Sequence, residues 1–155
     1  MNILGLDIAT QCGWALLSPE GDRMGSGVWD CSLSSGDSSA MRLIRFRQHL
    51  QQLKEWEVGL VGYELVRFSG RGNNSVYSQL QGQLLVLAEM WGIGCTGVSP
   101  SALKKFATGK GNSPKNTMIQ CAATQFSLDP MDLTHDEADA LWCAEWARVT
   151  HLGSP

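Results

Sequence analysis

Residues 2–8 read NILGLDI, a nearly unbroken apolar run with one carboxylate, Asp7, close to its end. Such a run predicts a buried β-strand. A carboxylate at the end of a buried strand costs free energy unless another group pairs with it. Asp7 therefore either caps a turn or pairs with an arginine, or it belongs to a site that other elements complete.

The pattern downstream of this strand predicts an α/β domain. Two further strands follow after short turns, and two later strands alternate with amphipathic helices. The predicted strands are 14–17, 23–29, 58–63 and 93–98, and the predicted helices are 40–56, 75–91, one from 100, 115–126 and 135–150. Since no linker or repeat interrupts the sequence, we expect one domain over residues 1–155. Its five-stranded mixed sheet begins with three antiparallel strands and is flanked by helices.

The composition excludes several classes of protein. The chain has 155 residues, of which 43% are hydrophobic, which is typical of a globular protein and not of a disordered one. No apolar run approaches the roughly 18 residues that a membrane span needs, and the N-terminus lacks the basic segment of a signal peptide. Five cysteines without a C-x-x-C pair favour reduced thiols over disulfides or a zinc site. We therefore expect a cytoplasmic protein.

Charge is unevenly distributed along the chain. The net charge is −3, but residues 38–128 carry ten basic and four acidic side chains. Residues 1–37 carry five acids against one base, and residues 129–155 carry six acids against one base. A basic middle between two acidic ends suits carboxylates that hold cations beside a surface that meets phosphates. Charged runs are also typical of a solvated surface, so this pattern alone leaves both interpretations open.

Three more carboxylates could join Asp7 in one site. Glu64 ends a second apolar strand, and Asp136 and Asp139 share one face of the last predicted helix. Carboxylates gathered in this way repel one another unless cations neutralise them, and oxygen ligands suit Mg²⁺ or Mn²⁺ better than Zn²⁺. The structural alternatives are a surface position for Glu64 and a favourable interaction of both aspartates with the helix dipole.

The start of the last helix carries two further polar residues. Thr134 and Glu137 fit the capping box S/T-x-x-E, with Thr134 at the N-cap, so we leave Glu137 outside the site. His135 precedes Asp139 by four residues and could approach the site, although a histidine at a helix start is often incidental.

Four segments, in this order, resemble the RuvC-type Holliday junction resolvases of the RNase H-like superfamily. The opening strand ILGLDIA (3–9) runs into GWA (13–15), and VGYE (61–64) resembles the second acidic motif of that family. The segment SPSALKKFATGKG (99–111) resembles its basic segment, and DEADAL (136–141) resembles its closing helix. The first strand alone is also similar to the sugar-kinase and actin superfamily, but the four segments span nearly the whole chain.

The resemblance implies an RNase H-like fold and a Mg²⁺-dependent endonuclease that resolves four-way DNA junctions as a homodimer. It assigns catalysis and metal binding to Asp7, Glu64, Asp136 and Asp139, with Asp7 shared by two Mg²⁺ ions roughly 3.5–4 Å apart. Mn²⁺ suits the same ligands. The implied product of each of two symmetric nicks has 5′-phosphate and 3′-hydroxyl ends.

Basic residues are expected to contact DNA. The expected contacts are Arg67, Phe68, Arg71, Lys104, Lys105, Lys110 and Lys115. In many bacterial members an aromatic residue follows the second acid by three positions, whereas here Arg67 holds that place and Phe68 follows it. The segment 67–74 is more similar to that of phage-encoded members, so a phage-type member is possible.

Several alternatives stay open at this point. The helix 75–91 is the expected dimer interface, with Tyr77, Val86 and Met90 outside its apolar stripe, but a monomer could bury both faces. A related RNase H-like nuclease acting on other branched DNA or on RNA, such as a YqgF-like enzyme, would share the four acids. A junction-binding module would bind DNA without cutting it. A sugar-kinase-like ATPase needs two such domains, for which 155 residues are too few.

Overall fold

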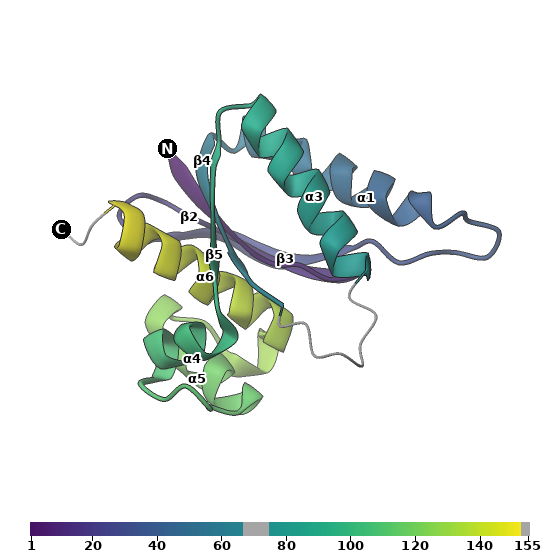
Figure 1. Cartoon of the computed structure of the whole chain (residues 1–155). Helices are drawn as coiled ribbons and strands as arrows, with labels where there is room; N and C mark the ends of the chain where they lie inside the picture. The colour runs from purple at the N-terminus through teal and green to yellow at the C-terminus, as the bar shows by residue number, and fades with distance from the viewer. Residues whose placement is uncertain (67–74, 153–155) are drawn as a thin grey trace.

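The computed structural model describes residues 1–66 and 75–152 and contains a five-stranded mixed sheet (Figure 1). The spatial order of the strands is β3-β2-β1-β4-β5. β1, β2 and β3 pair antiparallel, whereas β4 pairs parallel with both β1 and β5. The strands are β1 (Asn2–Asp7), β2 (Gln11–Leu17), β3 (Arg23–Asp30), β4 (Val58–Glu64) and β5 (Gly94–Val98). All five predicted strands are therefore present, and the predicted mixed sheet is confirmed.

Helices cover both faces of this sheet, as Figure 1 shows. The helices are α1 (Ala40–Leu50), α2 (Gln52–Glu55), α3 (Ser75–Met90), α4 (Pro100–Thr108), α5 (Lys115–Phe126) and α6 (His135–Leu152), with a 3₁₀ turn at Pro130–Asp132. α1, α2 and α3 cover one face, and α6 lies against β1, β2 and β4 on the other, with α4 and α5 packed around its first half. The sheet thus separates two hydrophobic cores.

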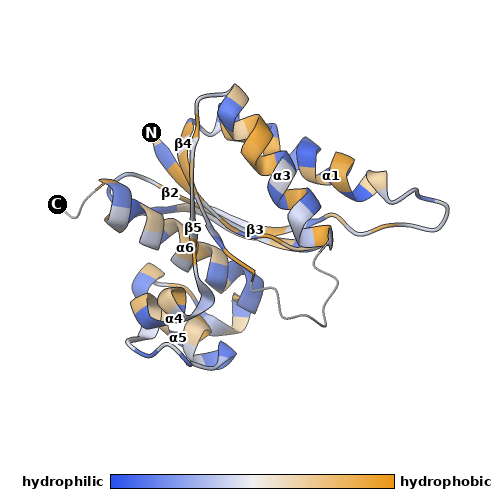
Figure 2. Ribbon diagram, in the orientation of Figure 1, coloured by the Kyte–Doolittle hydropathy of each residue, from blue (hydrophilic) through white to orange (hydrophobic). Residues whose placement is uncertain are grey.

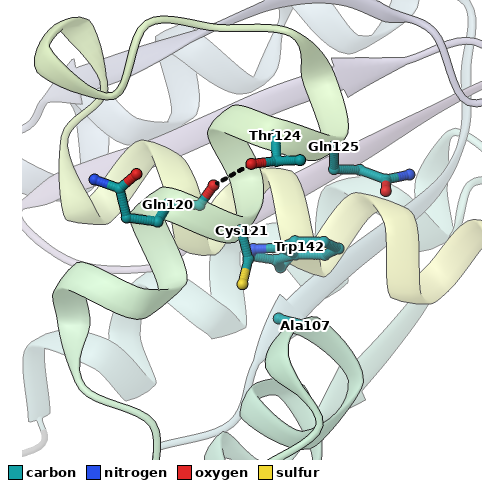
Figure 3. A pocket seen from close by; sticks show the side chains of 6 residues that line it. All are labelled: Ala107, Gln120, Cys121, Thr124, Gln125 and Trp142. Atoms are coloured by element: carbon teal, nitrogen blue, oxygen red, sulfur yellow. Dashed lines mark hydrogen bonds between the residues drawn. The ribbon is translucent and has the colours of Figure 1, made fainter.

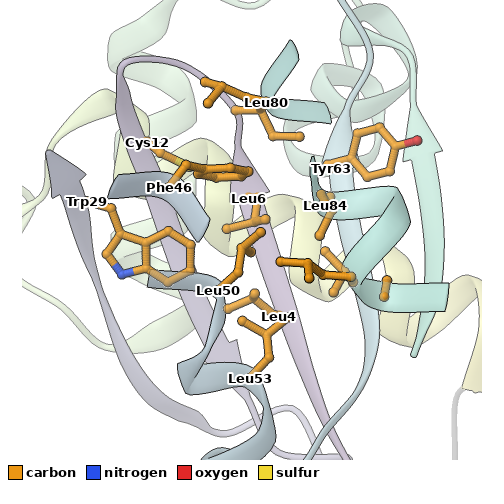
Figure 4. Close-up of a cluster of buried hydrophobic side chains, with 14 of the residues drawn as sticks. Leu4, Leu6, Cys12, Trp29, Phe46, Leu50, Leu53, Tyr63, Leu80 and Leu84 are labelled. Carbon is orange, nitrogen blue, oxygen red and sulfur yellow. The ribbon is translucent and has the colours of Figure 1, made fainter. Parts of the chain in front are cut away.

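The alternation of side chains along the strands decides which residues face each core. Leu4 and Leu6 of β1 point into the core beneath α1 and α3, which Figure 4 shows together with Phe46 and Leu84. Ile3 points to the opposite core, which α6 completes. Because side chains alternate with a period of two, Asp7 follows Ile3 onto the α6 face. The hydropathy colouring of Figure 2 shows apolar residues along α3, of which Leu80, Leu84 and Leu87 belong to the core beneath this helix.

α6 lies directly on the sheet because glycines face it. A Cβ atom added at Gly5 would lie 1.9 Å from the Ala140 carbonyl oxygen, and one at Gly13 would lie 2.0 Å from the Asp136 carbonyl oxygen. These separations are too short for any side chain, so only glycine permits this approach. The backbone of the first turn of α6 is consequently held against β2.

Three sequence predictions within the helices are wrong. The predicted helix 40–56 is two helices, because the Gln51 amide hydrogen-bonds to the carbonyls of both Arg47 and Gln48 and tightens the backbone there. The helical spacing of Met41, Ile44, Leu50 and Leu53 in the sequence predicts that Ile44 faces the core. Ile44 is instead 44% exposed, since it lies about 200° around the helix from the buried Phe46. Tyr77, expected outside the apolar stripe of α3, is buried, and its hydroxyl donates to the Glu64 carbonyl.

The cysteines, which all lie among the described residues, form no disulfide bond. All five cysteines are free; three are buried, and Cys95 and Cys121 are partly buried. Within the described ranges, no helix has the length and apolar character needed to cross a membrane.

Candidate active site

The site begins at the carboxyl ends of two adjacent parallel strands. Asp7 is the last residue of β1 and Glu64 the last residue of β4. Leu6 of β1 pairs with Tyr63 of β4 in the parallel register. The next residue of each strand is an acid, so Asp7 and Glu64 lie side by side at the same edge of the sheet. Both side chains alternate onto the α6 face, because Gly62 lies beneath α6 two residues before Glu64. Strand ends at this edge are where α/β proteins usually build sites.

The first turn of α6 brings Asp136 and Asp139 to this edge. Gly13 pairs with Asp7 across the β1–β2 hairpin and supports the backbone of Asp136. Asp136 therefore lies beside Asp7, and its interaction with Asp7 contributes to raising the pKa of Asp7. Asp139 lies one turn further along, where it interacts electrostatically with Asp7, Asp136 and Glu64.

Burial and mutual repulsion make these carboxylates difficult to ionise together. Burial, followed by the charges of Asp139 and Glu64, raises the pKa of Asp7 to about 9. Burial and the charges of Glu64 and Asp136 raise the pKa of Asp139 to about 7, against the opposing effect of Lys104 and Lys115. Burial also raises the pKa of Glu64, which Lys104 partly offsets. The four acids thus form one electrostatic unit that a cation would stabilise.

A cavity of about 240 Å³ opens between these acids and the α4–α5 segment. Acidic and basic side chains share its wall, which is lined by Glu64, Lys104, Ser113, Pro114, Lys115, Met118, His135 and Asp139. The backbone around it is well anchored: Thr108 bonds to the main chain of Lys110 and its hydroxyl contacts that of Ser113. The cavity therefore combines anionic and cationic groups at one place, as a site for a phosphate and cations requires.

The donor chemistry of the site fits hard divalent cations. Carboxylate oxygens are the ligands that Mg²⁺ and Mn²⁺ prefer. Burial, followed by neighbouring carboxylates, raises the pKa of Asp7 and Asp139, and a cation would favour their ionised forms. Over residues 1–66 and 75–152, no three acidic, histidine or cysteine side chains already converge on a point that would hold a metal ion.

The structure places the basic residues that were expected to contact DNA in different surroundings. Lys104 and Lys115 line the cavity. Lys105 is exposed on α4, about 100° around the helix from Lys104, and Lys110 is exposed in the α4–α5 loop. Arg67, Phe68 and Arg71 lie outside the described residues. Sequence reasoning could not distinguish Lys104 from Lys105, since adjacent lysines carry the same local signal.

The polar residues at the start of α6 have distinct partners. The Glu137 amide donates to the Thr134 hydroxyl over 3.1 Å, as the capping prediction requires. The Glu137 carboxylate does not turn back to the cap; it accepts a hydrogen bond from Ser26 over 2.5 Å and lies 3.9 Å from Arg23. This interaction joins the first turn of α6 to β3, so Glu137 has a structural role there.

His135, which the sequence left open, lies inside the site. Its Nε2 is 3.2 Å from Oδ2 of Asp139. Burial and the charge of Lys115 lower the pKa of this ring. Its i, i+4 spacing to Asp139 was the available sequence signal.

A second, larger cavity carries different chemistry. It measures about 330 Å³ and lies between α4, α5 and α6, where Figure 3 shows Trp142 beside Cys121. Its lining consists of Ala107, Gln120, Cys121, Thr124, Gln125 and Trp142 and includes no acidic or basic side chain. The smaller cavity beside the acids is therefore the candidate active site.

Comparison with known proteins identifies relatives over nearly the full chain. No protein family model matches the sequence. The chain is 33% identical over 159 residues to the crossover junction endodeoxyribonuclease RuvC of Anaeromyxobacter sp. (strain K), which covers 98% of this chain and 80% of that protein. It is 25% identical over 146 residues to the protein of the same name from Synechococcus sp. (strain WH7803), with 91% of this chain and 94% of that protein covered.

A solved structure shares the fold. Thermus thermophilus RuvC, in complex with Holliday junction substrate, matches with a TM-score of 0.82 at 22% identity, over 97% of this chain and 96% of that one. The RNase H-like fold expected from the sequence is thereby confirmed. These relatives are bacterial, and phage origin stays a prediction.

Proposed function

Because this chain belongs to the RuvC family of crossover junction endodeoxyribonucleases, we propose that it is a Holliday junction resolvase. It cuts four-way DNA by hydrolysing phosphodiester bonds, and so serves DNA recombination and repair. The observation that carries this assignment is the cavity in which Glu64 and Asp139 face Lys104 and Lys115. The solved relative bound to a Holliday junction supports four-way DNA as the substrate.

The proposed cofactor is a pair of Mg²⁺ ions, for which Mn²⁺ can substitute. Asp7, Glu64, Asp136 and Asp139 would hold them. Burial and then mutual repulsion raise the pKa of Asp7 and Asp139, and divalent cations would relieve that repulsion. When bound, such ions supply an activated water and neutralise charge on the phosphate under attack. The chain's own contribution is to hold four oxygen ligands at one edge of a rigid sheet.

Lys104 and Lys115 are the proposed contacts to the phosphate nearest the acids. Both lie in the cavity wall, and both affect the ionisation of Asp139. Lys105 and Lys110 are exposed beside the cavity and would extend this interaction along the DNA backbone. Arg67, Phe68 and Arg71 are proposed to meet the junction on sequence grounds alone. Since these residues mainly bind phosphates, DNA binding should weaken steeply with salt.

A two-fold homodimer is the proposed assembly, because paired cuts on opposed strands need two sites related by symmetry. α3 is the proposed interface. Val86 is 59% exposed and Met90 is 68% exposed on its outer side, next to Leu85. Gly82 has open space where a side chain would stand, which would let a second helix approach closely.

A cleavage assay tests the proposed function. Purified protein is incubated with a labelled four-way junction, a matched linear duplex and a matched RNA duplex, with Mg²⁺ or with EDTA. Paired, symmetric, Mg²⁺-dependent nicks in the junction alone are expected. Equal cutting of linear duplex or RNA would instead identify a broader RNase H-like nuclease. Junction binding without cutting would identify a recognition module.

A further inference from the structure

The His135 ring lies directly against one of the proposed metal ligands. Its Nε2 lies 3.2 Å from Oδ2 of Asp139, one helical turn along α6. The His135 side chain is 30% exposed and that of Asp139 is 9% exposed, so the ring closes over a nearly buried carboxylate. Among the ion pairs of the described residues, this is the one that involves the Asp139 carboxylate.

We propose that His135 is a positioning residue that fixes the orientation of the Asp139 carboxylate within the acidic group. This inference rests on the proposed function, because it assumes that Asp139 binds a divalent cation. His135 is not proposed as a metal ligand or as a group that reacts.

The backbone at this point is held independently of the ring. The Thr134 hydroxyl accepts from the Glu137 amide, and the Thr134 carbonyl accepts from the Ala138 amide over 3.0 Å. The helix start therefore does not need the His135 side chain. The ring can therefore contact Asp139 without any role in capping the helix. Replacing the ring should leave α6 in place.

Asp139 needs such a partner because competing charges surround it. Glu64 and Asp136 repel its carboxylate, whereas Lys104 and Lys115, which line the same cavity, attract it. Without His135, rotation of the side chain would let the lysines draw the carboxylate away from the other acids. Contact with the ring restricts this rotation, which is the usual role of groups that support metal ligands.

Mn²⁺ binding to the full chain without DNA provides the direct test, measured as the decrease of the free-ion electron paramagnetic resonance signal. Removing a group that supports a ligand typically costs 10–100-fold in metal affinity or activity. His135→Ala should therefore raise the Mn²⁺ dissociation constant about 10-fold. His135→Gln can donate from an amide nitrogen close to the position of Nε2 and should recover most of the affinity.

His151→Ala is the matched control. His151 belongs to the other end of α6, where Nε2 lies 2.9 Å from the Thr96 hydroxyl. Its replacement should leave Mn²⁺ binding unchanged. Junction cleavage by His135→Ala should need more Mg²⁺ and recover at high Mg²⁺, while junction binding in EDTA and the melting temperature stay near wild type.

Two outcomes would overturn the inference: wild-type Mn²⁺ affinity in His135→Ala, or equally weakened affinity in His135→Gln and His135→Ala. If His135→Ala does not fold, His135→Asn and His135→Gln still decide the question, because only Gln carries its donor as far as Nε2. Failure of the proposed function is distinguishable. A wild-type protein that binds Mn²⁺ but never cuts junctions would refute the resolvase and leave the role of His135 intact.

Discussion

Burial and three neighbouring carboxylates together raise the pKa of Asp7 to about 9. Near neutral pH and without a cation, this side chain therefore holds a proton. A divalent cation that binds the acids must displace that proton, so metal binding at this site should strengthen as pH rises. At the scale of single residues, burial and charge repulsion disfavour the ionised acids in the metal-free protein, and a bound cation would favour them.

Asp7→Asn should abolish cleavage and preserve junction binding. The substitution replaces a carboxylate ligand that lies among the three other acids of the site. We therefore expect the cleavage rate to fall by more than about 100-fold. Binding in EDTA should equal or exceed that of wild type, because no negative charge is added near the phosphates. Gel cleavage and gel shift on one labelled junction measure both effects. Cutting at the wild-type rate would refute the assignment of Asp7.

The lysines of α4 and α5 should differ in effect according to where they lie. Lys104→Ala and Lys115→Ala should lower both junction affinity and the cleavage rate at saturating protein, since both side chains line the cavity. Lys105→Ala, the exposed neighbour, should lower affinity alone. Removing one lysine that binds a phosphate should reduce the slope of log affinity against log salt by about 1. An unchanged slope would exclude that lysine from the DNA surface.

At the scale of elements, the first turn of α6 is held on three sides. β2 supports it through Gly13, β3 reaches it through Ser26 and Glu137, and Thr134 caps it. These interactions fix where Asp136 and Asp139 meet the ends of β1 and β4. The geometry of the site therefore depends on residues that have no role in the chemistry.

Gly13→Ala should damage the site by displacing this turn. The added methyl would lie 2.0 Å from the Asp136 carbonyl oxygen, so backbone must move. Overpacking of this kind costs about 1–3 kcal/mol of stability, and cleavage should fall further than stability alone explains. Gly94→Ala on β5 is the control, because its methyl would lie at ordinary van der Waals distances from its neighbours. Thermal melts and single-turnover cleavage, compared between the two variants, measure the difference; equal activities would contradict the prediction.

At the scale of the whole molecule, the acids lower the stability of the metal-free protein as pH rises. A carboxyl group whose pKa is raised by folding stabilises the folded state below its unfolded pKa of about 4. That contribution disappears as pH rises through the folded values of about 7 for Asp139 and about 9 for Asp7. The folded state binds more protons than the unfolded state across this window, so the free energy of unfolding falls with pH.

The melting temperature in EDTA should therefore fall between about pH 5 and pH 9. Mg²⁺ should restore it most at the alkaline end, because a bound cation favours the ionised acids. Asp7→Asn should flatten the decline, since it removes the group with the largest raised value. Calorimetry across the pH range, with and without Mg²⁺, measures all three effects. A wild-type melting temperature that rises steadily with pH in EDTA would contradict the proposed origin of these shifts.

Local patterns in the sequence determined the elements, their order and the acids at the strand ends. Apolar runs and helical periodicity act over a few residues, so they predicted the five strands and located Asp7 and Glu64 without knowledge of the fold. Four motifs in order identified the family. Periodicity failed where packing overrode it, at Ile44 and Tyr77, because both positions depend on which neighbour occupies the core.

Only the tertiary structure decided which side chains meet. It places Lys104 rather than Lys105 beside the acids and directs Glu137 to Ser26. These interactions depend on strand register and on how closely α6 approaches the sheet at Gly5 and Gly13. Distances between elements far apart in the sequence are set by packing of the folded chain, and no local pattern encodes them.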